Sequence, residues 1–154
     1  ADNQQSDLLE LSEIEVKYIR KRTIQASPQI RTSEDSYNVF IQIWDMETID
    51  YIENIYVMFL SRSNRVLGIS KISQGGSAGS VVDVKIVLGK AILAHSNGII
   101  LAHNHPSGSL IPSPSDIEIT SKIKGGAELL DITLLDHIIV TSEGYSSMAD
   151  EALI

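Results

Sequence analysis

Two histidines and an aspartate in the second half of the chain have the types and the spacing that suit a metal ion. His103 and His105 follow the apolar run Ile99–Ala102, and Asp116 stands eleven positions after His105. Residues two apart on a strand point to the same side, so the two imidazoles can converge. A carboxylate from the next element completes three ligands, and zinc enzymes often leave a fourth position for water. The pattern indicates a hydrolytic zinc site.

Ser113 and Asp116 also fit a purely structural interpretation. Ser113-Pro114-Ser115-Asp116 is typical of a helix start, with Ser113 as the cap, Pro114 in the first helical position and Asp116 three residues after the cap. This interpretation explains both polar residues without a metal. The two interpretations are compatible, because a carboxylate in the first helical turn can favour the helix dipole and also bind a cation.

A hydrolytic site also needs a group that takes a proton from water and passes it to the leaving nitrogen. Glu53 stands just before the apolar run 55–60 and is the candidate. From the residues alone, an exposed glutamate at a strand edge explains Glu53 equally well. Glu47 and Glu118 are rivals for the same role.

The other two histidines of the chain have structural interpretations. His95 falls in the last turn of a helix expected over 83–95, where a positive charge suits the helix dipole. His137 follows Asp136 within an apolar strand, and we expect a buried, hydrogen-bonded ring. A supporting role behind the metal ligands is the alternative for His137.

The elements that must position these residues alternate without a regular βα order, which favours an α/β or α+β domain. We expect a helix that Ser33 caps and that carries Tyr37, Phe40, Ile41 and Trp44 on one face. Further helices are expected at 83–95, ended by Asn97-Gly98, and at 113–130. Strands are expected at 14–18, 55–60, 66–72, 98–102 and 134–140, with a connecting loop at 74–80.

Length and composition indicate one ordinary globular domain. The chain has 154 residues, of which 43% are hydrophobic and 21% are charged. It has no cysteine, which excludes disulfides and thiolate ligands and fits a reducing compartment. No apolar run is long enough to span a membrane, and the polar, acidic start shows no secretory signal. We therefore expect a cytoplasmic protein.

The charge balance argues against nucleic acid as the main partner. The formal net charge is −8, whereas binding to phosphates relies on positive charge. One basic cluster runs from Lys17 to Arg31. It is interpreted as a solvated face, with a small nucleic-acid patch as the alternative. Nothing in the sequence predicts the oligomeric state or the substrate.

Longer motifs resemble a known family. Glu53 … His103-Asn104-His105-Pro106 … Ser113-Pro114-Ser115-Asp116 resembles the JAMM signature of MPN-domain metalloproteases. The stretches 100–108 and 134–140 resemble RadC-type bacterial proteins in particular. The resemblance runs from about Ser33 to Ile154 and implies an MPN/JAMM (RadC-like) domain at 33–154. The preceding residues 1–32 are then an N-terminal extension, made of a strand and the basic segment. This extension is too short for the helix-hairpin-helix DNA-binding region that RadC proteins usually carry.

The resemblance implies a fold, a cofactor and roles for single residues. The fold would be the layered α/β/α, cytidine-deaminase-like MPN/JAB fold with a mixed sheet. His103, His105 and Asp116 would hold Zn²⁺ together with a water, Glu53 would be the acid/base, and Ser113 would stabilise the oxyanion. The reaction would be hydrolysis of an amide bond in an unknown peptide, isopeptide or protein substrate. Two alternatives stay open: a RadC-like, DNA-repair-associated nucleic-acid-binding protein, and a non-catalytic interaction domain.

Overall fold

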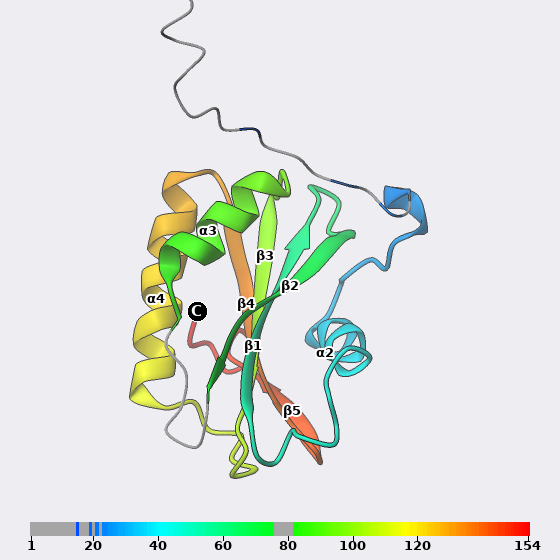
Figure 1. Ribbon diagram of the computed structural model, residues 1–154. Coiled ribbons are helices and arrows are strands. Elements are labelled where there is room, and N and C mark those ends of the chain that lie inside the picture. The colour runs from blue at the N-terminus through cyan, green and yellow to red at the C-terminus, as the bar shows by residue number, and fades with distance from the viewer. Residues whose placement is uncertain (1–14, 16–18, 20, 22, 76–81) are drawn as a thin grey trace, which may run out of the picture.

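A five-stranded mixed sheet lies at the centre of the computed structural model, which describes residues 15, 19, 21, 23–75 and 82–154 (Figure 1). Its strands, in the order β2-β1-β3-β4-β5, pair antiparallel except for β3 and β4, which are parallel. The strands are β1 (Glu53–Leu60), β2 (Val66–Gly75), β3 (Gly98–Asn104), β4 (Thr133–Thr141) and β5 (Gly144–Ser147).

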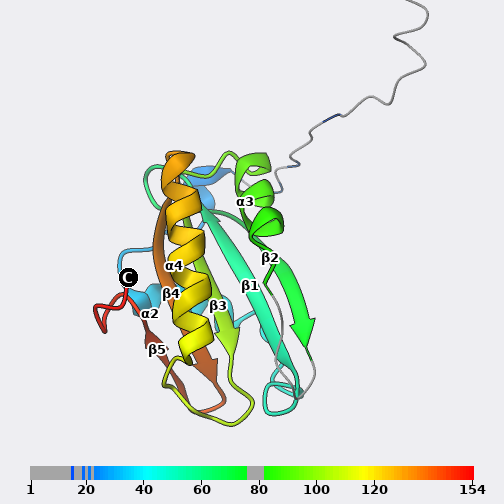
Figure 2. The ribbon, with the colours of Figure 1, turned by 90° about the vertical axis from the view of Figure 1, so that its left-hand side faces the viewer.

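Helices cover both faces of this sheet. Figures 1 and 2 show α3 (Val84–Leu93) and α4 (Pro114–Leu129) on one face and α2 (Ser33–Ile41) on the other. A short 3-10 helix, η1 (Ile24–Ala26), precedes α2. The result is the predicted mixed α+β fold in three layers, helix, sheet and helix.

The alternation of side chains along β3 divides the interior into two cores. Ile99 and Leu101 pack in the core beneath α3 and α4, and Ile100 and Ala102 pack in the core beneath α2. All seven residues of β3 are buried, so both faces of this central strand are covered. Because side chains alternate, His103 follows Ile99 and Leu101 to the α4 side of the sheet.

The predicted start of α2 was wrong by one residue. The cap is Thr32 and not Ser33: the Thr32 hydroxyl accepts the Asp35 N–H at 3.2 Å, and the Asp35 carboxylate accepts the Thr32 N–H at 3.1 Å. Thr32 has an acid three residues later, which a capping box requires, whereas Ser33 has Ser36. Since α2 ends at Ile41, Trp44 is buried but lies beyond the helix.

The predicted end of the helix at 83–95 was also wrong. Asp83 caps α3, but the helix ends at Leu93, and His95 has a left-handed backbone with φ 54°. The N–H of the following Ser96 reaches back to the Ala91 carbonyl at 3.1 Å and closes the helix end. The helix therefore stops before the predicted Asn97-Gly98 signal, and Gly98 opens β3.

The loop predicted at 74–80 and the strand predicted at 14–18 lie partly outside the residues that the structure describes. Gln74 and Gly75, predicted as loop, belong to β2 and pair with β1, while residues 76–81 of that loop lie outside the described residues. Ile14, Val16 and Tyr18, which carry the strand predicted at 14–18, also lie outside them. Within the described part of the chain, no helix has the length and apolar character to cross a membrane.

Candidate metal centre

Three polar side chains meet where β3 ends and α4 begins. The Nε2 atoms of His103 and His105 are 2.8 Å apart. Asp116 Oδ2 lies 3.3 Å from His103 Nε2 and 3.1 Å from His105 Nε2. His103 stands on β3, His105 directly after it, and Asp116 in the first turn of α4. The structure thus brings together the three residues that the sequence analysis singled out as metal ligands.

A capping box holds the Asp116 carboxylate in this position. The Ser113 hydroxyl accepts the Asp116 N–H at 3.1 Å, and Asp116 Oδ2 accepts the Ser113 N–H at 2.8 Å. Pro114 stands at the start of the helix, where its missing N–H costs no hydrogen bond. The predicted cap is therefore present. Its carboxylate oxygen also faces both imidazoles, so the structural and the metal-binding interpretations of Asp116 coexist.

The donor set fits a tetrahedral zinc ion. Zn–N and Zn–O bonds of about 2.0–2.2 Å at tetrahedral angles place neighbouring ligand atoms about 3.3 to 3.6 Å apart. The separations of 2.8 to 3.3 Å among His103 Nε2, His105 Nε2 and Asp116 Oδ2 reach the lower end of that range, so a small outward shift of the side chains accommodates the ion. Two imidazole nitrogens and one carboxylate oxygen are also donor types that zinc accepts.

The charges of the cluster are coupled. The hydrogen bond with Asp116 raises the pKa of His105 and outweighs burial, which acts in the opposite direction. Burial acts to raise the pKa of Asp116, but hydrogen bonds from His103 and His105 hold that pKa well below its usual range. Asp116 is therefore an anion at neutral pH, and it presents a negative charge to whatever occupies the space between the rings.

Glu53 approaches the histidine pair from the neighbouring strand. β1 and β3 are antiparallel with Ile55 opposite His103, so Glu53, two residues before Ile55, lies at the end of the sheet where the chain continues from His103 to His105. One Glu53 carboxylate oxygen and one ring nitrogen of each histidine lie within 4.8 Å of one another. The strand register thus brings Glu53 to the site. Of the two rivals, Glu118 lines the same cavity and Glu47 does not.

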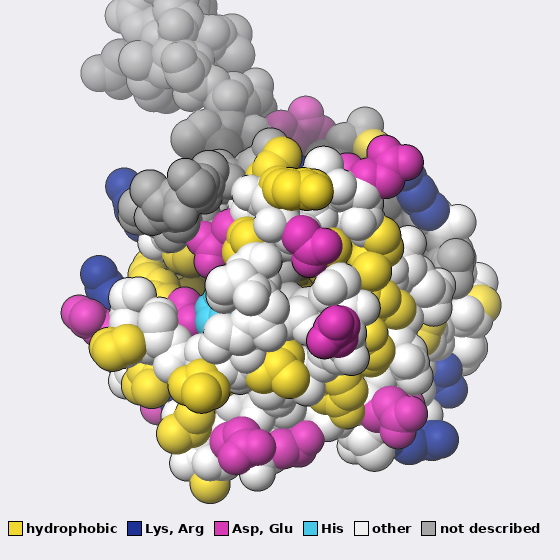
Figure 3. Space-filling view, turned by 90° about the horizontal axis from the view of Figure 1, so that it is seen from below, with side chains coloured by type: hydrophobic (Ala, Val, Ile, Leu, Met, Phe, Trp, Pro, Cys, Tyr) yellow, Lys and Arg dark blue, Asp and Glu magenta, His cyan; other side chains and the backbone are white. Residues whose placement is uncertain are grey.

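Glu53, His103 and Asp116 border a cavity of about 320 Å³, whereas His105 is not part of its lining. Seen from the end of the sheet where β3 stops, histidine surface is visible beside acidic and hydrophobic side chains (Figure 3). Ser115 borders the cavity, whereas the predicted oxyanion residue Ser113 does not; the two hydroxyls are 3.0 Å apart. The lining combines acids, one lysine, two histidines and apolar residues: Glu53, Ile55, Val82, His103, Ser115, Asp116, Glu118, Ile119, Lys122 and His137.

Asn104, between the two histidines, has a role that the sequence analysis missed. Its side chain is fully buried on the opposite side of the sheet from His103. Its amide donates to the carbonyls of Ile49 and Ile52 at 2.8 and 2.9 Å, and its oxygen accepts the Asn54 N–H at 2.7 Å. Asn104 therefore fastens the chain on both sides of Glu53 to the strand that carries His103.

His137 is the buried, hydrogen-bonded ring that the sequence analysis predicted. Its Nε2 lies 2.6 Å from His103 Nδ1, and its Nδ1 lies 2.6 Å from the Thr120 hydroxyl. Burial, and to a smaller extent His103, lowers the pKa of His137 well below its ordinary value, so the ring is neutral. Thr120 is a further residue that the sequence analysis missed. His95 is exposed beyond the end of α3, away from this cluster.

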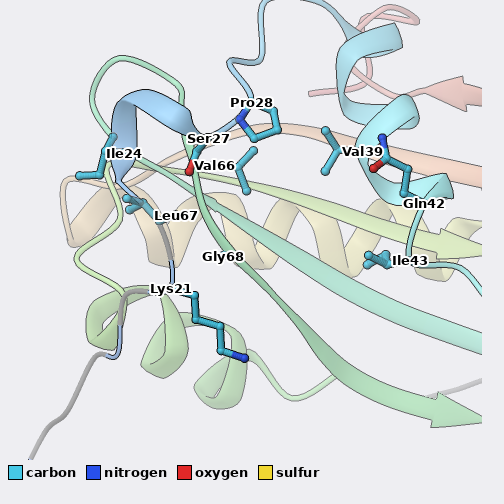
Figure 4. Close-up of a pocket in the computed structure, with 10 residues that line it drawn as sticks. All are labelled: Lys21, Ile24, Ser27, Pro28, Val39, Gln42, Ile43, Val66, Leu67 and Gly68. Atoms are coloured by element: carbon cyan, nitrogen blue, oxygen red, sulfur yellow. The ribbon is translucent and has the colours of Figure 1, made fainter.

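A second cavity, of about 350 Å³, lies between η1, α2 and β2 (Figure 4). Among the described residues, its lining includes no acid and no histidine, and Lys21 is its charged side chain. Without an acid or a histidine, the described lining of this cavity does not suit metal binding, and the histidine cavity is the candidate functional site. The lining is Lys21, Ile24, Ser27, Pro28, Val39, Gln42, Ile43, Val66, Leu67 and Gly68.

Similar proteins occur in several bacteria. A UPF0758 protein of Flavobacterium johnsoniae is 46% identical over 101 residues, which cover 66% of this chain and 44% of that protein. A UPF0758 protein of Porphyromonas gingivalis is 35% identical over 136 residues, covering 88% of this chain and 60% of the relative. One of Desulfitobacterium hafniense is 36% identical over 136 residues, with 87% and 60% covered. The chain therefore spans about half the length of the curated relatives it matches.

The family match covers most of the described structure. The model of the RadC-like JAB domain matches residues 30–153, which include the sheet, the helices α2, α3 and α4, and all residues of the histidine cluster. The boundary predicted between an extension at 1–32 and a domain at 33–154 stays a prediction. The sequence match and the mixed sheet agree: this chain belongs to the RadC-like JAB domain family.

Proposed function

We propose that this chain is a zinc-dependent hydrolase that cleaves an amide bond in a peptide or isopeptide substrate. The observation that carries the proposal is the convergence of His103, His105 and Asp116, whose ligand atoms lie 2.8 to 3.3 Å apart. Glu53 stands close to the same two rings on the adjacent strand. Three ligands beside a carboxylate base form the donor set of a catalytic zinc site.

The two nearby carboxylates receive different roles. Asp116 is the ligand in this proposal, because its Oδ2 lies within 3.3 Å of both imidazole nitrogens and a helix cap holds it there. Glu53 is the base, because its carboxylate is close to the rings and borders the cavity that substrate would enter. A base beside the open side of the ion can reach an attacking water.

The chain's own residues would move the protons. Bound zinc would polarise the scissile carbonyl and make a water molecule more acidic. Glu53 takes a proton from the attacking water and later gives it to the nitrogen that leaves, so the carboxylate is regenerated. The Ser113 hydroxyl accepts the Asp116 N–H and lies 3.0 Å from the Ser115 hydroxyl, which borders the cavity; its role in the proposal is to donate its proton to the developing oxyanion.

Replacement of the base tests the reaction separately from metal binding. In Glu53→Gln we expect an unchanged zinc content and a loss of hydrolysis by a factor on the order of 10² to 10⁴. A panel of peptide and isopeptide substrates measures the activity, and elemental analysis of the purified protein measures zinc. Glu47→Gln is the matched control, since Glu47 does not border the cavity. A Glu53→Gln protein that hydrolyses as fast as the wild type would contradict the proposal.

A further inference from the structure

A chain of three short hydrogen bonds runs from His103 to the helix that carries Asp116. His103 Nδ1 contacts His137 Nε2 at 2.6 Å, and His137 Nδ1 contacts the Thr120 hydroxyl at 2.6 Å. The Thr120 hydroxyl in turn donates to the Asp116 backbone carbonyl at 2.6 Å. All three side chains are buried, with 2 to 4% of their surface exposed. This series of hydrogen bonds thus connects β3, β4 and α4 behind the candidate metal centre.

The last bond sets the direction of the other two. A carbonyl oxygen only accepts, so the single Thr120 proton must point to Asp116; Met148 Sδ, a weaker acceptor, is 3.8 Å away. The Thr120 oxygen then accepts from His137, which places the proton of that ring on Nδ1. The Nε2 of the neutral ring is left as an acceptor, and it receives the proton of His103 Nδ1.

The consequence for His103 is that Nδ1 is already engaged, and Nε2, the atom that faces His105 and Asp116, is the nitrogen left for a metal ion. His105 reaches the same state in a simpler way, because its Nδ1 lies 2.8 Å from the Ser109 carbonyl and donates to it. Metal ions bind the unprotonated nitrogen of imidazole, and the partner of the other nitrogen determines which one that is. In both rings Nδ1 is thus held by a partner outside the ligand cluster, and Nε2 is the nitrogen that a metal ion would bind.

We propose that Thr120 and His137 are positioning residues that hold His103 in the metal-binding tautomer. The inference rests on the proposed function, in which His103 is a zinc ligand. It deepens that function by assigning residues on α4 and β4 to the affinity of the site for metal. Because Thr120 also bonds to the Asp116 carbonyl, the same hydroxyl links two of the three ligands.

Thr120→Val tests the proposal with little change in shape. Without an acceptor at this position, His137 favours a proton on Nε2, where it opposes the Nδ1–H of His103. We expect zinc affinity, measured by competition with a chelator, to fall by about 10- to 100-fold. Thr120→Ser keeps the hydroxyl and should bind zinc as the wild type does. Ser36→Ala is the matched control, because it removes a buried helix hydroxyl that also bonds four residues back, but on the α2 side.

Nitrogen-15 NMR of the histidine rings in the metal-free wild type gives a second measurement that needs no variant to fold. We expect His137 and His103 both to carry their proton on Nδ1. A proton on His137 Nε2, or equal zinc affinity in Thr120→Val and Thr120→Ser, would overturn the proposal. A wild-type protein with these tautomers that binds no zinc would instead contradict the proposed function, so the two failures are distinguishable.

Discussion

The helices α2 and α4 begin with the same local device and differ in what lies beside it. Thr32 and Asp35 form a capping box at α2, with hydrogen bonds of 3.1 and 3.2 Å, and Ser113 and Asp116 form one at α4, with hydrogen bonds of 2.8 and 3.1 Å. Asp35 also accepts the Arg31 N–H at 2.8 Å. Asp116 instead has the Nε2 atoms of His103 and His105 beside its Oδ2, at 3.3 and 3.1 Å.

The comparison shows that the sequence of a capping box does not decide whether its carboxylate is a candidate metal ligand. The side chains that the neighbouring sheet presents to the carboxylate decide it. α2 covers one face of the sheet and α4 covers the other (Figures 1 and 2). Because side chains alternate along β3, His103 points to the α4 face, as Ile99 and Leu101 do. The register of β3 decides which face of the sheet receives the histidine side chains, because a register shift of one residue would turn them to the α2 side. An aspartate in the first helical turn therefore serves as a cap at α2, whereas at α4 it serves as a cap and also faces two imidazoles.

The largest expected effect is on zinc affinity, and it distinguishes Asp116 from Asp35. Asp116→Asn keeps a side-chain oxygen that can cap α4 but removes the charge next to the histidines. We expect its zinc affinity to fall by more than about 100-fold, beyond the effect of losing an outer partner. Asp35→Asn should leave zinc affinity unchanged. Chelator competition measures both zinc affinities. Equal affinities for the two variants would contradict the assignment of Asp116, and not Asp35, as a metal ligand.

The next effect separates the two hydroxyls that cap. Thr32→Ala and Ser113→Ala each remove a cap and should each lower the free energy of unfolding by about 1 kcal/mol, measured in urea. Only Ser113→Ala should slow hydrolysis, by a factor on the order of 10² to 10³ for a lost oxyanion donor. If hydrolysis is unchanged in Ser113→Ala, Ser113 serves only as a helix cap. Ser115, which borders the cavity, is then the candidate oxyanion donor.

The smallest effect concerns the pH dependence of the α2 cap. Hydrogen bonds from the backbone N–H groups of Arg31 and Thr32 lower the pKa of Asp35. The stabilisation from this carboxylate is complete above the unfolded pKa of about 3.9 and is lost as pH falls through the lower folded value. The stability difference between the wild type and Asp35→Asn should therefore shrink from about pH 6 to about pH 3. A difference that stays constant in urea unfolding over that range would show that the charge of Asp35 does not contribute.

Local patterns were sufficient to predict most elements but not their ends. Apolar runs predicted β1, β3 and β4, and the Ser113-Pro114-Ser115-Asp116 pattern predicted the start of α4. The start of α2 was misplaced because Thr32 and Ser33 are both good caps, and the acid at Asp35 decides between them. The end of α3 was missed because His95 adopts a left-handed backbone that glycine or asparagine usually takes.

The parts of the site that depend on strand order could not be predicted from local patterns. Asn104 and Thr120 have no motif of their own, and their partners are distant in the sequence: Asn104 bonds to Ile49 across 55 residues, and Thr120 bonds to His137 across 17. These contacts exist because β3 pairs with both β1 and β4. The position of Glu53 follows from the same pairing, so a resemblance to a family singled it out where the residues alone did not.

The central claim is that His103, His105 and Asp116 together bind one zinc ion and leave it open to solvent. Anomalous diffraction at the zinc edge, from crystals of the zinc-loaded protein, tests it most directly. We predict one peak about 2.0 to 2.2 Å from both histidine Nε2 atoms and from Asp116 Oδ2, with no fourth protein ligand. The absence of a peak between these residues, a peak bonded to Glu53 in place of Asp116, or a closed shell of four protein ligands would contradict the account.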